Sequence, residues 1–331
     1  MRRRAFLKYS ALSGALYSVT AACDRSPKWQ RDALRKKDAS RVAILSAARY
    51  DQPLRDVILR GIQLCGLGVK GKKILLKPNL VEFDPKGVIN TNPAVIEAAV
   101  DAFRSLGAAQ VTVAEGPGHR RDNEYLLSAS GLYDVIKEHR VSYIDLNTDD
   151  VRATPLRSRF TDFKQLYLPE SLYDADVLVS MPKLKTHHWA GVTLSLKNMF
   201  GVVPGVVYGW PKNILHWQGI NNSILDINSS LPLPQFAIID GIVGMEGNGP
   251  LQGQPKNSGV LIFGDDLVAV DATAARLMTL EPQKIDYLAK AAEFLGNLDQ
   301  EKIHQVGERI DALRQDFAVI EDFQKLKKLT S

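Results

Sequence analysis

Cysteine is scarce in this 331-residue chain, where only Cys23 and Cys65 occur. Two cysteines cannot make a disulfide framework and are too few for the usual four-thiolate cluster site, so we expect no iron–sulfur cluster. The sequence also lacks the GxSxG, HExxH and CxxC motifs. The common serine hydrolase, zinc protease and thiol redox functions therefore have no support in the sequence.

The apolar run near the N-terminus is too short to span a membrane. It extends over 14 residues, from Tyr9 to Ala22, whereas a membrane-spanning helix needs about 20. Basic residues precede it and small residues follow it, which is the layout of an export signal. Arg3-Arg4 resembles the twin-arginine signature. Thr20-Ala21-Ala22-Cys23 resembles a lipobox, although leucine is commoner at the position of Thr20.

We therefore expect residues 1–22 to be a signal peptide that the twin-arginine export machinery reads. Cys23 is then lipidated and residues 23–40 form a tether. The protein lies at the periplasmic face of the cell envelope, anchored to a membrane by its lipid. A plain N-terminal anchor helix is the alternative. Cleavage removes four basic residues and no acid, which lowers the formal net charge from +5 to +1. A nearly neutral protein does not attract nucleic acid generally, so we expect no nucleic acid partner.

Strand-like and helix-like segments alternate from residue 42 onward. The predicted strands are Val42–Ala47, Lys73–Leu80, Gln110–Ala114, Ala175–Ser180, Gln235–Ile239 and Gly259–Phe263, and the predicted helices are Leu54–Cys65, Pro93–Leu106, Glu124–His139 and Ala269–Leu280. This alternation predicts an α/β fold with a mainly parallel, doubly wound sheet, helices on both faces and a long inserted loop at 201–222. We expect the domain to cover 41–300, as one unit or as lobes at about 41–150 and 170–300. A helical tail follows over 301–331.

Polar residues follow the predicted strands, and open parallel sheets bind ligands outside the carboxyl ends of their strands. Lysine and asparagine side chains there can bind a phosphate or a carboxylate. The residues predicted to bind a small anionic ligand are Lys77, Asn79, Asn92, Lys183, Lys185 and Asn198.

Residues 181–201, MPKLKTHHWAGVTLSLKNMFG, form the densest polar stretch. His187 and His188 are candidate catalytic proton carriers. Lys197 is a third catalytic candidate, because an unpartnered charge inside an apolar run is costly without a purpose. Alternation along an extended segment would place Lys183, Lys185 and His187 on one side. The alternative is a solvated charged loop in which one histidine packs on a tryptophan.

Carboxylates provide a predicted metal site. The glycine-rich stretch 238–255 carries Asp240 and Glu246, whose oxygens suit a hard cation such as Mg²⁺. Glu115 and Asp271 complete the predicted set of metal ligands. A glycine-rich turn is the alternative for the stretch, and an acid near the start of a helix often serves only as a cap.

Six segments together resemble the family called domain of unknown function 362. They are KPNLV (77–81), NTNP (90–93), AEGPG (114–118), SMPKLKTHHWAGVTLSLKNMFGVVPG (180–205), IIDGIVGMEGNGP (238–250) and GVLIFGDDLVAVDATAARLM (259–278). The resemblance runs from about Val42 to Leu280. It implies that the matching strand-end residues form a site, and it implies no particular reaction. Some members of the family carry a cysteine-rich ferredoxin-like module, which this chain lacks.

Two functions fit these observations. The first is an exported enzyme that holds a divalent cation through Asp240, Glu246 and Asp271, binds a small anionic substrate through its lysines, and uses His187 or His188 as acid or base. The second is a non-catalytic envelope protein that binds an anionic ligand or cofactor and delivers it to a partner. A third interpretation makes the polar cluster a structural network, in which Lys197→Ala would lower stability rather than ligand affinity.

Overall fold

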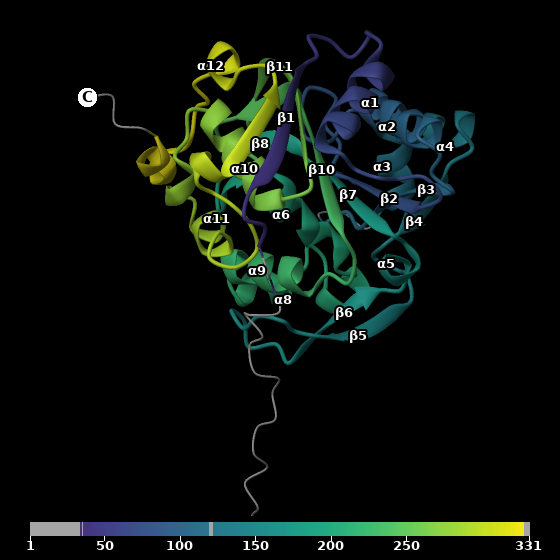
Figure 1. Ribbon diagram of the computed structural model, residues 1–331. Helices are drawn as coiled ribbons and strands as arrows, with labels where there is room; N and C mark the ends of the chain where they lie inside the picture. Colours follow the sequence, from purple (N-terminus) through teal and green to yellow (C-terminus); the bar gives the residue numbers. More distant parts are fainter. Residues whose placement is uncertain (1–33, 35, 119–121, 328–331) are drawn as a thin grey trace, which may run out of the picture.

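One ten-stranded sheet runs through the computed structural model, which describes residues 34, 36–118 and 122–327 (Figure 1). The strands lie in the order β12-β1-β11-β10-β7-β2-β3-β4, with β8 beside β10 and β9 beside β8. Their bounds are β1 Ser40–Ser46, β2 Lys73–Pro78, β3 Gln110–Glu115, β4 Ser142–Asp145, β7 Val177–Met181, β8 Lys183–His187, β9 Gly191–Thr193, β10 Gln235–Glu246, β11 Gln254–Gly264 and β12 Ile303–Gly307. A separate antiparallel sheet contains β5 (Val151–Pro155) and β6 (Gln165–Pro169).

Helices connect most of these strands. The α-helices are α1 Leu54–Cys65, α2 Pro93–Ser105, α3 Asn123–Ala129, α4 Leu132–Glu138, α5 Ser171–Asp174, α6 Ser195–Asn198, α7 Gly205–Tyr208, α8 Asn213–Trp217, α9 Ile220–Ser230, α10 Leu267–Leu277, α11 Asp286–Ala291 and α12 Ile310–Leu313. Short 3₁₀ helices are η2 Met199–Val202, η3 Pro282–Lys284, η4 Gln300–Lys302 and η5 Glu321–Leu326.

The two faces of the sheet bury separate hydrophobic clusters. Alternation along β1 directs Ala43 and Leu45 into the cluster that packs under α1, α2, α3 and α4. Val42 and Ile44 join the opposite cluster, which packs against α6, α9, α10 and α11. Side chains of a strand point alternately to its two faces, so both faces of the sheet must be apolar here. The predicted α/β fold with helices on both faces is confirmed.

Parallel pairing holds together one half of the sheet, from β10 through β7, β2 and β3 to the edge strand β4. Antiparallel pairing enters at β11, which pairs with β1 on one side and β10 on the other. The predicted strand Gln235–Ile239 continues as β10 to Glu246, and a turn then leads into β11. Much of the stretch for which a glycine-rich turn was the alternative is therefore strand, since Val243–Glu246 pair with Gln254–Asn257 of β11.

Two helix predictions differ from the structure. The helix predicted over Glu124–His139 is divided into α3 and α4 at Gly131, whose φ of 78° does not belong to a right-handed helix. The tail was expected to be helical, but residues 303–307 form β12, which pairs parallel with β1. Pairing with β12 occupies the open edge of β1, where unpaired backbone groups are otherwise exposed.

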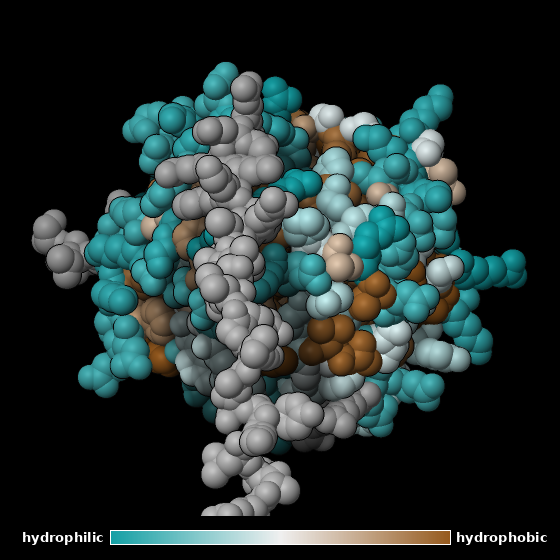
Figure 2. All heavy atoms as spheres, turned by 90° about the horizontal axis from the view of Figure 1, so that it is seen from below, coloured by the Kyte–Doolittle hydropathy of each residue, from teal (hydrophilic) through white to brown (hydrophobic). Residues whose placement is uncertain are grey.

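The segment predicted as a long loop, 201–222, is built from η2, α7, α8 and the start of α9. Strands from 41–150 and from 170–300 pair directly, since β2 lies beside β7, so one sheet includes both predicted lobes. In the view from below, most of the coloured residues are hydrophilic, and apolar residues lie among them (Figure 2).

Candidate functional site

A cavity of about 270 Å³ opens at the carboxyl ends of β2, β3 and β8, beneath the segment 200–216. The described residues of its lining include four lysines, three histidines and one acid. These residues are Lys77, Lys185, Lys197, Lys212, His187, His188, His216 and Glu115. Apolar walls come from Leu80, Trp189, Phe200, Pro211 and Leu251, among others. Carboxyl ends of parallel strands meet at one edge of a sheet, so residues far apart in the chain converge there.

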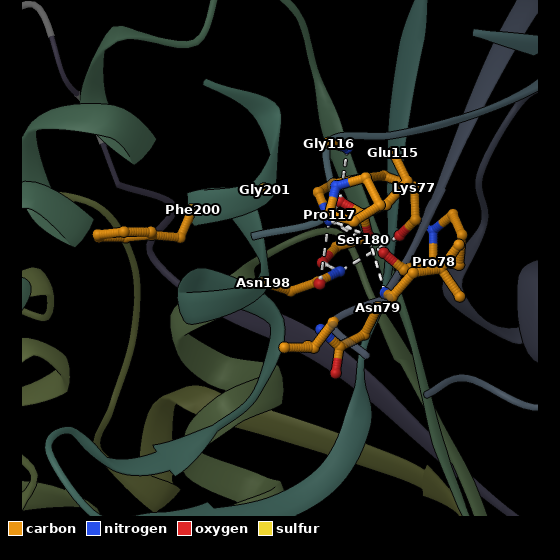
Figure 3. Close-up of polar contacts among 12 residues, drawn as sticks. Lys77, Pro78, Asn79, Glu115, Gly116, Pro117, Ser180, Asn198, Phe200 and Gly201 are labelled. Carbon is orange, nitrogen blue, oxygen red and sulfur yellow. Dashed lines mark hydrogen bonds and ion pairs between the residues drawn. The ribbon is translucent and has the colours of Figure 1, made fainter. Parts of the chain in front are cut away.

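Lys77 and Glu115 form an ion pair at the base of this cavity (Figure 3). Nζ of Lys77 lies 2.7 Å from Oε1 of Glu115, and each side chain is 1% exposed. The backbone N–H groups of Leu80 and Gly116 also donate to the Glu115 carboxylate, at 3.0 and 2.9 Å. Burial lowers the pKa of Lys77, and the charge of Glu115 opposes that effect. Among the described residues of the lining, Glu115 is the only acid, and it is already neutralised.

Asn198 connects this ion pair to the neighbouring strand (Figure 3). Its Oδ1 accepts from Nζ of Lys77 at 3.2 Å, and its Nδ2 donates to the backbone oxygen of Lys77 and to Oγ of Ser180. These bonds use both sides of the amide group. Asn198 therefore holds Lys77 in place, which differs from the direct anion contact predicted for it.

Lys212 was not predicted from the sequence. It precedes α8 with a φ of 67°, and its Nζ reaches across the cavity to the backbone oxygens of Gly116, Phe200 and Gly201 at 2.8, 3.4 and 3.0 Å. Burial lowers its pKa to about 7. Its role could not be predicted from the sequence, because a lysine in a loop is ordinarily solvated. The conformation of residues 200–216 directs the side chain of Lys212 into the cavity.

Lys185 and Lys197 have no acidic partner among the described residues. Nζ of Lys185 donates to the backbone oxygen of Ile89 at 2.9 Å. Burial and the nearby charge of Lys197 hold the pKa of Lys185 well below its usual range. Nζ of Lys197 lies 4.4 Å from the centre of the Phe200 ring, and burial lowers its pKa to about 8. Cations without counterions in a closed space favour an anionic ligand.

The three histidines differ in which ring nitrogen carries the hydrogen, although Nδ1 is the nitrogen bonded to the protein in each. Nδ1 of His187 accepts from the backbone N–H groups of Trp189 and Ala190, which assigns the hydrogen of the neutral ring to Nε2. Burial, with the charge of Lys197 second, lowers the pKa of His187 far below its usual range, so it stays neutral. Nδ1 of His188 donates to Gly249 and Nδ1 of His216 to Lys212, which leaves Nε2 of each neutral ring as an acceptor.

Two buried oxygens of the cavity lining have no hydrogen-bond partner among the described residues. They are Oδ1 of Asn79 and Oγ1 of Thr193. Asn79 is 7% exposed, and its backbone N–H donates to Thr91. Buried polar atoms are usually hydrogen-bonded, so these two indicate room for a polar ligand.

A second cavity, of about 260 Å³, lies beyond β8 and is lined by Lys183, Asn92 and Tyr50. Nζ of Lys183 lies 2.6 Å from Oδ2 of Asp240, with side chains 1% and 0% exposed. Hydroxyl Oη of Tyr50 donates to Asp240 and accepts from Lys183. The backbone N–H of Asn92 also donates to Asp240, while its side chain caps α2 by accepting from Ala94. Lys183 and Asn92 therefore belong to a different cavity from the other predicted anion ligands.

Residues 74–276 match the family described as Domain of unknown function (DUF362). The chain belongs to this family. The matched range begins in β2 and ends in α10, so the DUF362 domain contains every lining residue of both cavities except Tyr50.

Similar proteins have also been found by sequence and by structure. A thylakoid-associated protein of Synechocystis sp. is 30% identical over 238 residues, which cover 68% of each chain. The apoprotein of lactate racemase from Thermoanaerobacterium thermosaccharolyticum is 14% identical, with a TM-score of 0.44 over 74% of this chain and 58% of that one. A Thermotoga maritima protein is 13% identical, with a TM-score of 0.35 over 76% and 60%. This chain spans less than two thirds of either solved chain, and these TM-scores support no inference about function.

The four carboxylates predicted as metal ligands lie apart in the DUF362 domain, each with its own partners. Glu115 pairs with Lys77 and Asp240 with Lys183. Oε2 of Glu246 lies 3.1 Å from Nζ of Lys256 and accepts from the backbone of Ala318. Within the described residues, no group of three His, Cys, Asp or Glu side chains is placed to hold a metal ion. These four carboxylates therefore do not form the single cation site that the sequence suggested.

Asp271, the fourth of these acids, supports the first turn of α6. Its carboxylate accepts from the backbone N–H groups of Ser195 and Leu196, at 2.7 and 3.0 Å, and from the hydroxyl of Ser195. Because Lys197 follows directly in α6, Asp271 positions that lysine at the cavity.

The signal, tether and lipidation predictions concern residues 1–40, of which 1–33 and 35, with Cys23, lie outside the described part. In the part of the chain that the structure does describe, no helix has the length and apolar character to cross a membrane. Cys65 is a partly buried free thiol whose pKa burial raises to about 11.

Proposed function

We propose that this chain is an enzyme that binds a small anionic substrate in the lysine-lined cavity and moves protons with its histidines. The observation that carries the proposal is the charge of that cavity. Three buried lysines and the partly buried Lys197 surround it, and its only acid among the described lining residues is neutralised by Lys77. A carboxylate or phosphate would supply the missing negative charge, and the apolar walls leave room for a short carbon chain.

The histidines provide the cavity with a hydrogen-bond donor and with proton acceptors, which catalysis needs in addition to binding. Nε2–H of His187 is a fixed donor for a developing negative charge, and Nε2 of His188 or His216 is an acceptor for a proton. A delivery protein needs the lysines but not this division of donors and acceptors. The divalent cation of the sequence hypothesis is left out of the proposal, because the four predicted acids bind protein partners.

The proposal is tested by the melting temperature of the chain with phosphate or oxalate as the probe. Lys185→Met should abolish the ligand-induced rise in Tm, because it removes one of the amines that would bind the anion. The variant should still fold, because methionine is apolar, of similar size, and replaces a buried amine that has no acidic partner among the described residues. The exposed Lys70 provides the matched control, and Lys70→Met should keep the full rise. Dialysis against EDTA should leave the rise unchanged. A rise that survives Lys185→Met would contradict an anion site in this cavity.

The same experiment has a defined pH dependence. The lowered pKa values of Lys197, about 8, and Lys212, about 7, mean that the folded cavity loses positive charge between about pH 7 and 9. Anion affinity should therefore fall over that interval. In the free protein the opposite trend is expected, because the unfolded chain, with lysine pKa values near 10.5, binds more protons than the folded one. The contribution of these lysines to stability thus rises from about pH 7 to 10.

We further propose that the protein is exported and held at a membrane by a lipid on Cys23. The support is the N-terminal sequence, together with the name of the Synechocystis relative, which describes that protein as thylakoid-associated. In a bacterial host with twin-arginine export, Cys23→Ser should move the protein from the membrane fraction to the soluble fraction. Replacement of Arg3 and Arg4 by Lys should retain it in the cytoplasm with its signal uncleaved. Unchanged membrane binding of Cys23→Ser would show that another segment anchors the chain.

A further inference from the structure

Among the four lysines of the lysine-lined cavity of about 270 Å³, here called the main cavity, Lys197 alone has a terminal nitrogen without a hydrogen-bond acceptor among the described residues. Nζ of Lys77 is bonded to Glu115, Asn198 and the backbone of Pro78. Nζ of Lys212 is bonded to three backbone oxygens, and Nζ of Lys185 to one. The interaction recorded for Nζ of Lys197 is with the face of the Phe200 ring.

This arrangement makes Lys197 chemically different from its neighbours. Hydrogen bonds to the protein hold the nitrogens of Lys77, Lys185 and Lys212, so these nitrogens are not free to turn towards a bound carbonyl group. An amine that lacks acceptors and lies beside other cations loses its proton readily, and this is how enzymes activate a lysine nucleophile. The pKa of about 8 for Lys197 follows from burial first and from the charge of Lys77 second. Much of Lys197 is therefore the free amine at mildly alkaline pH.

We propose that Lys197 forms an imine with a small aldehyde or ketone that also carries a carboxylate or phosphate group. This inference rests on the proposed function and narrows its substrate class. The cavity, of about 270 Å³, admits a molecule of a few carbon atoms. Lys185 and Lys212 would face the anionic group, while Phe200 and Leu251 would flank the carbon chain. The unsatisfied oxygens of Asn79 and Thr193 would meet the polar atoms of the carbonyl hydrate or carbinolamine.

The step balances without an oxidant, a reductant or a second substrate. The lone pair of Nζ attacks the carbonyl carbon, and the π electrons of the C=O bond move to oxygen. One proton passes from nitrogen to that oxygen, which gives the carbinolamine. A second proton from nitrogen then passes to the hydroxyl group, the C–O bond breaks, and water leaves as the C=N bond forms. Nε2 of His216 holds the free lone pair that accepts and returns the proton, since its Nδ1 is committed to Lys212. His216 lines the same cavity and packs against Phe200, with ring centres 5.1 Å apart.

Asp271 gives the amine its position. It fixes the backbone of Ser195 and Leu196 at the start of α6, and it lies behind the helix rather than in the cavity. A carboxylate that holds the backbone can orient Lys197 without neutralising it. The buried acid of α10 thus acts on Lys197 through the backbone of α6 and not through the lysine nitrogen.

The test is reductive trapping on the full chain. The protein is incubated at about pH 8, near the pKa of Lys197, with sodium cyanoborohydride and either pyruvate or glycolaldehyde phosphate. The adduct is located by peptide mass spectrometry. We expect a reduced adduct on Lys197 with at least one of the two probes, and none with propionate, which lacks the carbonyl group. Lys197→Arg should lose the adduct, because the guanidinium group of arginine cannot form the imine.

The outcomes separate this inference from the proposed function. An oxalate-induced rise in Tm without any adduct would overturn the imine and leave anion binding intact. An adduct found on Lys185, Lys212 or exposed lysines to the same extent as on Lys197 would also overturn it. Absence of both the rise and the adduct would contradict the anion site itself. If Lys197→Arg fails to fold, the wild-type adduct map still decides, since it requires no variant.

Discussion

Asp240→Asn is expected to lower the free energy of unfolding by about 3–5 kcal/mol, the cost of leaving one partner of a buried ion pair without the other. Nζ of Lys183 lies 2.6 Å from the Asp240 carboxylate in a place closed to water. Burial already lowers the pKa of Lys183, and the charge of Asp240 opposes that effect. With Asn in its place, Lys183 must lose its proton or remain charged without a counterion. Urea unfolding at pH 7 measures the difference.

Glu246→Gln provides the matched control, because Glu246 was predicted to share a metal site with Asp240. Glu246 pairs with Lys256, and their side chains are 20% and 28% exposed. Partly exposed pairs contribute little, so this change should cost less than about 1 kcal/mol. A double variant, Asp240→Asn with Lys183→Met, should recover part of the loss, since the unpaired cation is removed. Equal, small effects of both single substitutions, together with loss of a bound divalent cation, would favour the metal site instead.

The fold was predictable where strands and helices alternate regularly. Helix α1 has the predicted bounds, Leu54–Cys65, because its apolar stripe and the glycine after it define both ends. The predicted strand Gln235–Ile239 was too short because Asp240 and Gly241 suggest a turn, yet the backbone continues past them in β10. β12 was missed because its alternation is weak and its pairing with β1 depends on residues more than 200 positions away.

The candidate site was predictable to the extent that sheet geometry determines it. Lys77, Glu115, Lys185, His187 and Lys197 line one cavity. Lys77 and Glu115 lie at the ends of β2 and β3, and Lys185 and His187 lie in β8, whereas Lys197 comes from α6. What the sequence could not supply was the partner of each charge. Lysines and carboxylates at strand ends suggested separate anion and cation sites, whereas the fold joins two of each into ion pairs.

Residues outside the strand ends were harder to find. Lys212 reaches the main cavity because of a left-handed turn before α8, and Tyr50 reaches Asp240 from the segment after β1. Neither belongs to a recognisable motif. Both positions depend on loop conformation, which has no periodic signal in the sequence.

Gly201→Ala is expected to cost about 3 kcal/mol of stability, the upper part of the range for overpacked sites, and to weaken anion binding. A Cβ atom on Gly201 would overlap Oε1 of Glu115 and lie 2.6 Å from Nζ of Lys77. Neither neighbour can move without losing other bonds. Glu115 is held by Leu80 and Gly116, and Lys77 by Asn198. Chemical unfolding measures the cost, and the oxalate-induced change in Tm measures the effect on the cavity.

Gly118→Ala is the matched control, because Gly118 lines the same cavity and a Cβ there meets no described atom within 4 Å. It should change stability by less than about 0.5 kcal/mol. If both substitutions were equally mild, the ion pair would have to be more mobile than its hydrogen bonds indicate. If Gly201→Ala alone is severe, the glycine is required by the close approach of 199–202 to Lys77 and Glu115. Residues 199–202 then cover the ion pair, and Glu115 stays paired with Lys77. The other lysines of the cavity have no acidic partner among the described residues as a result.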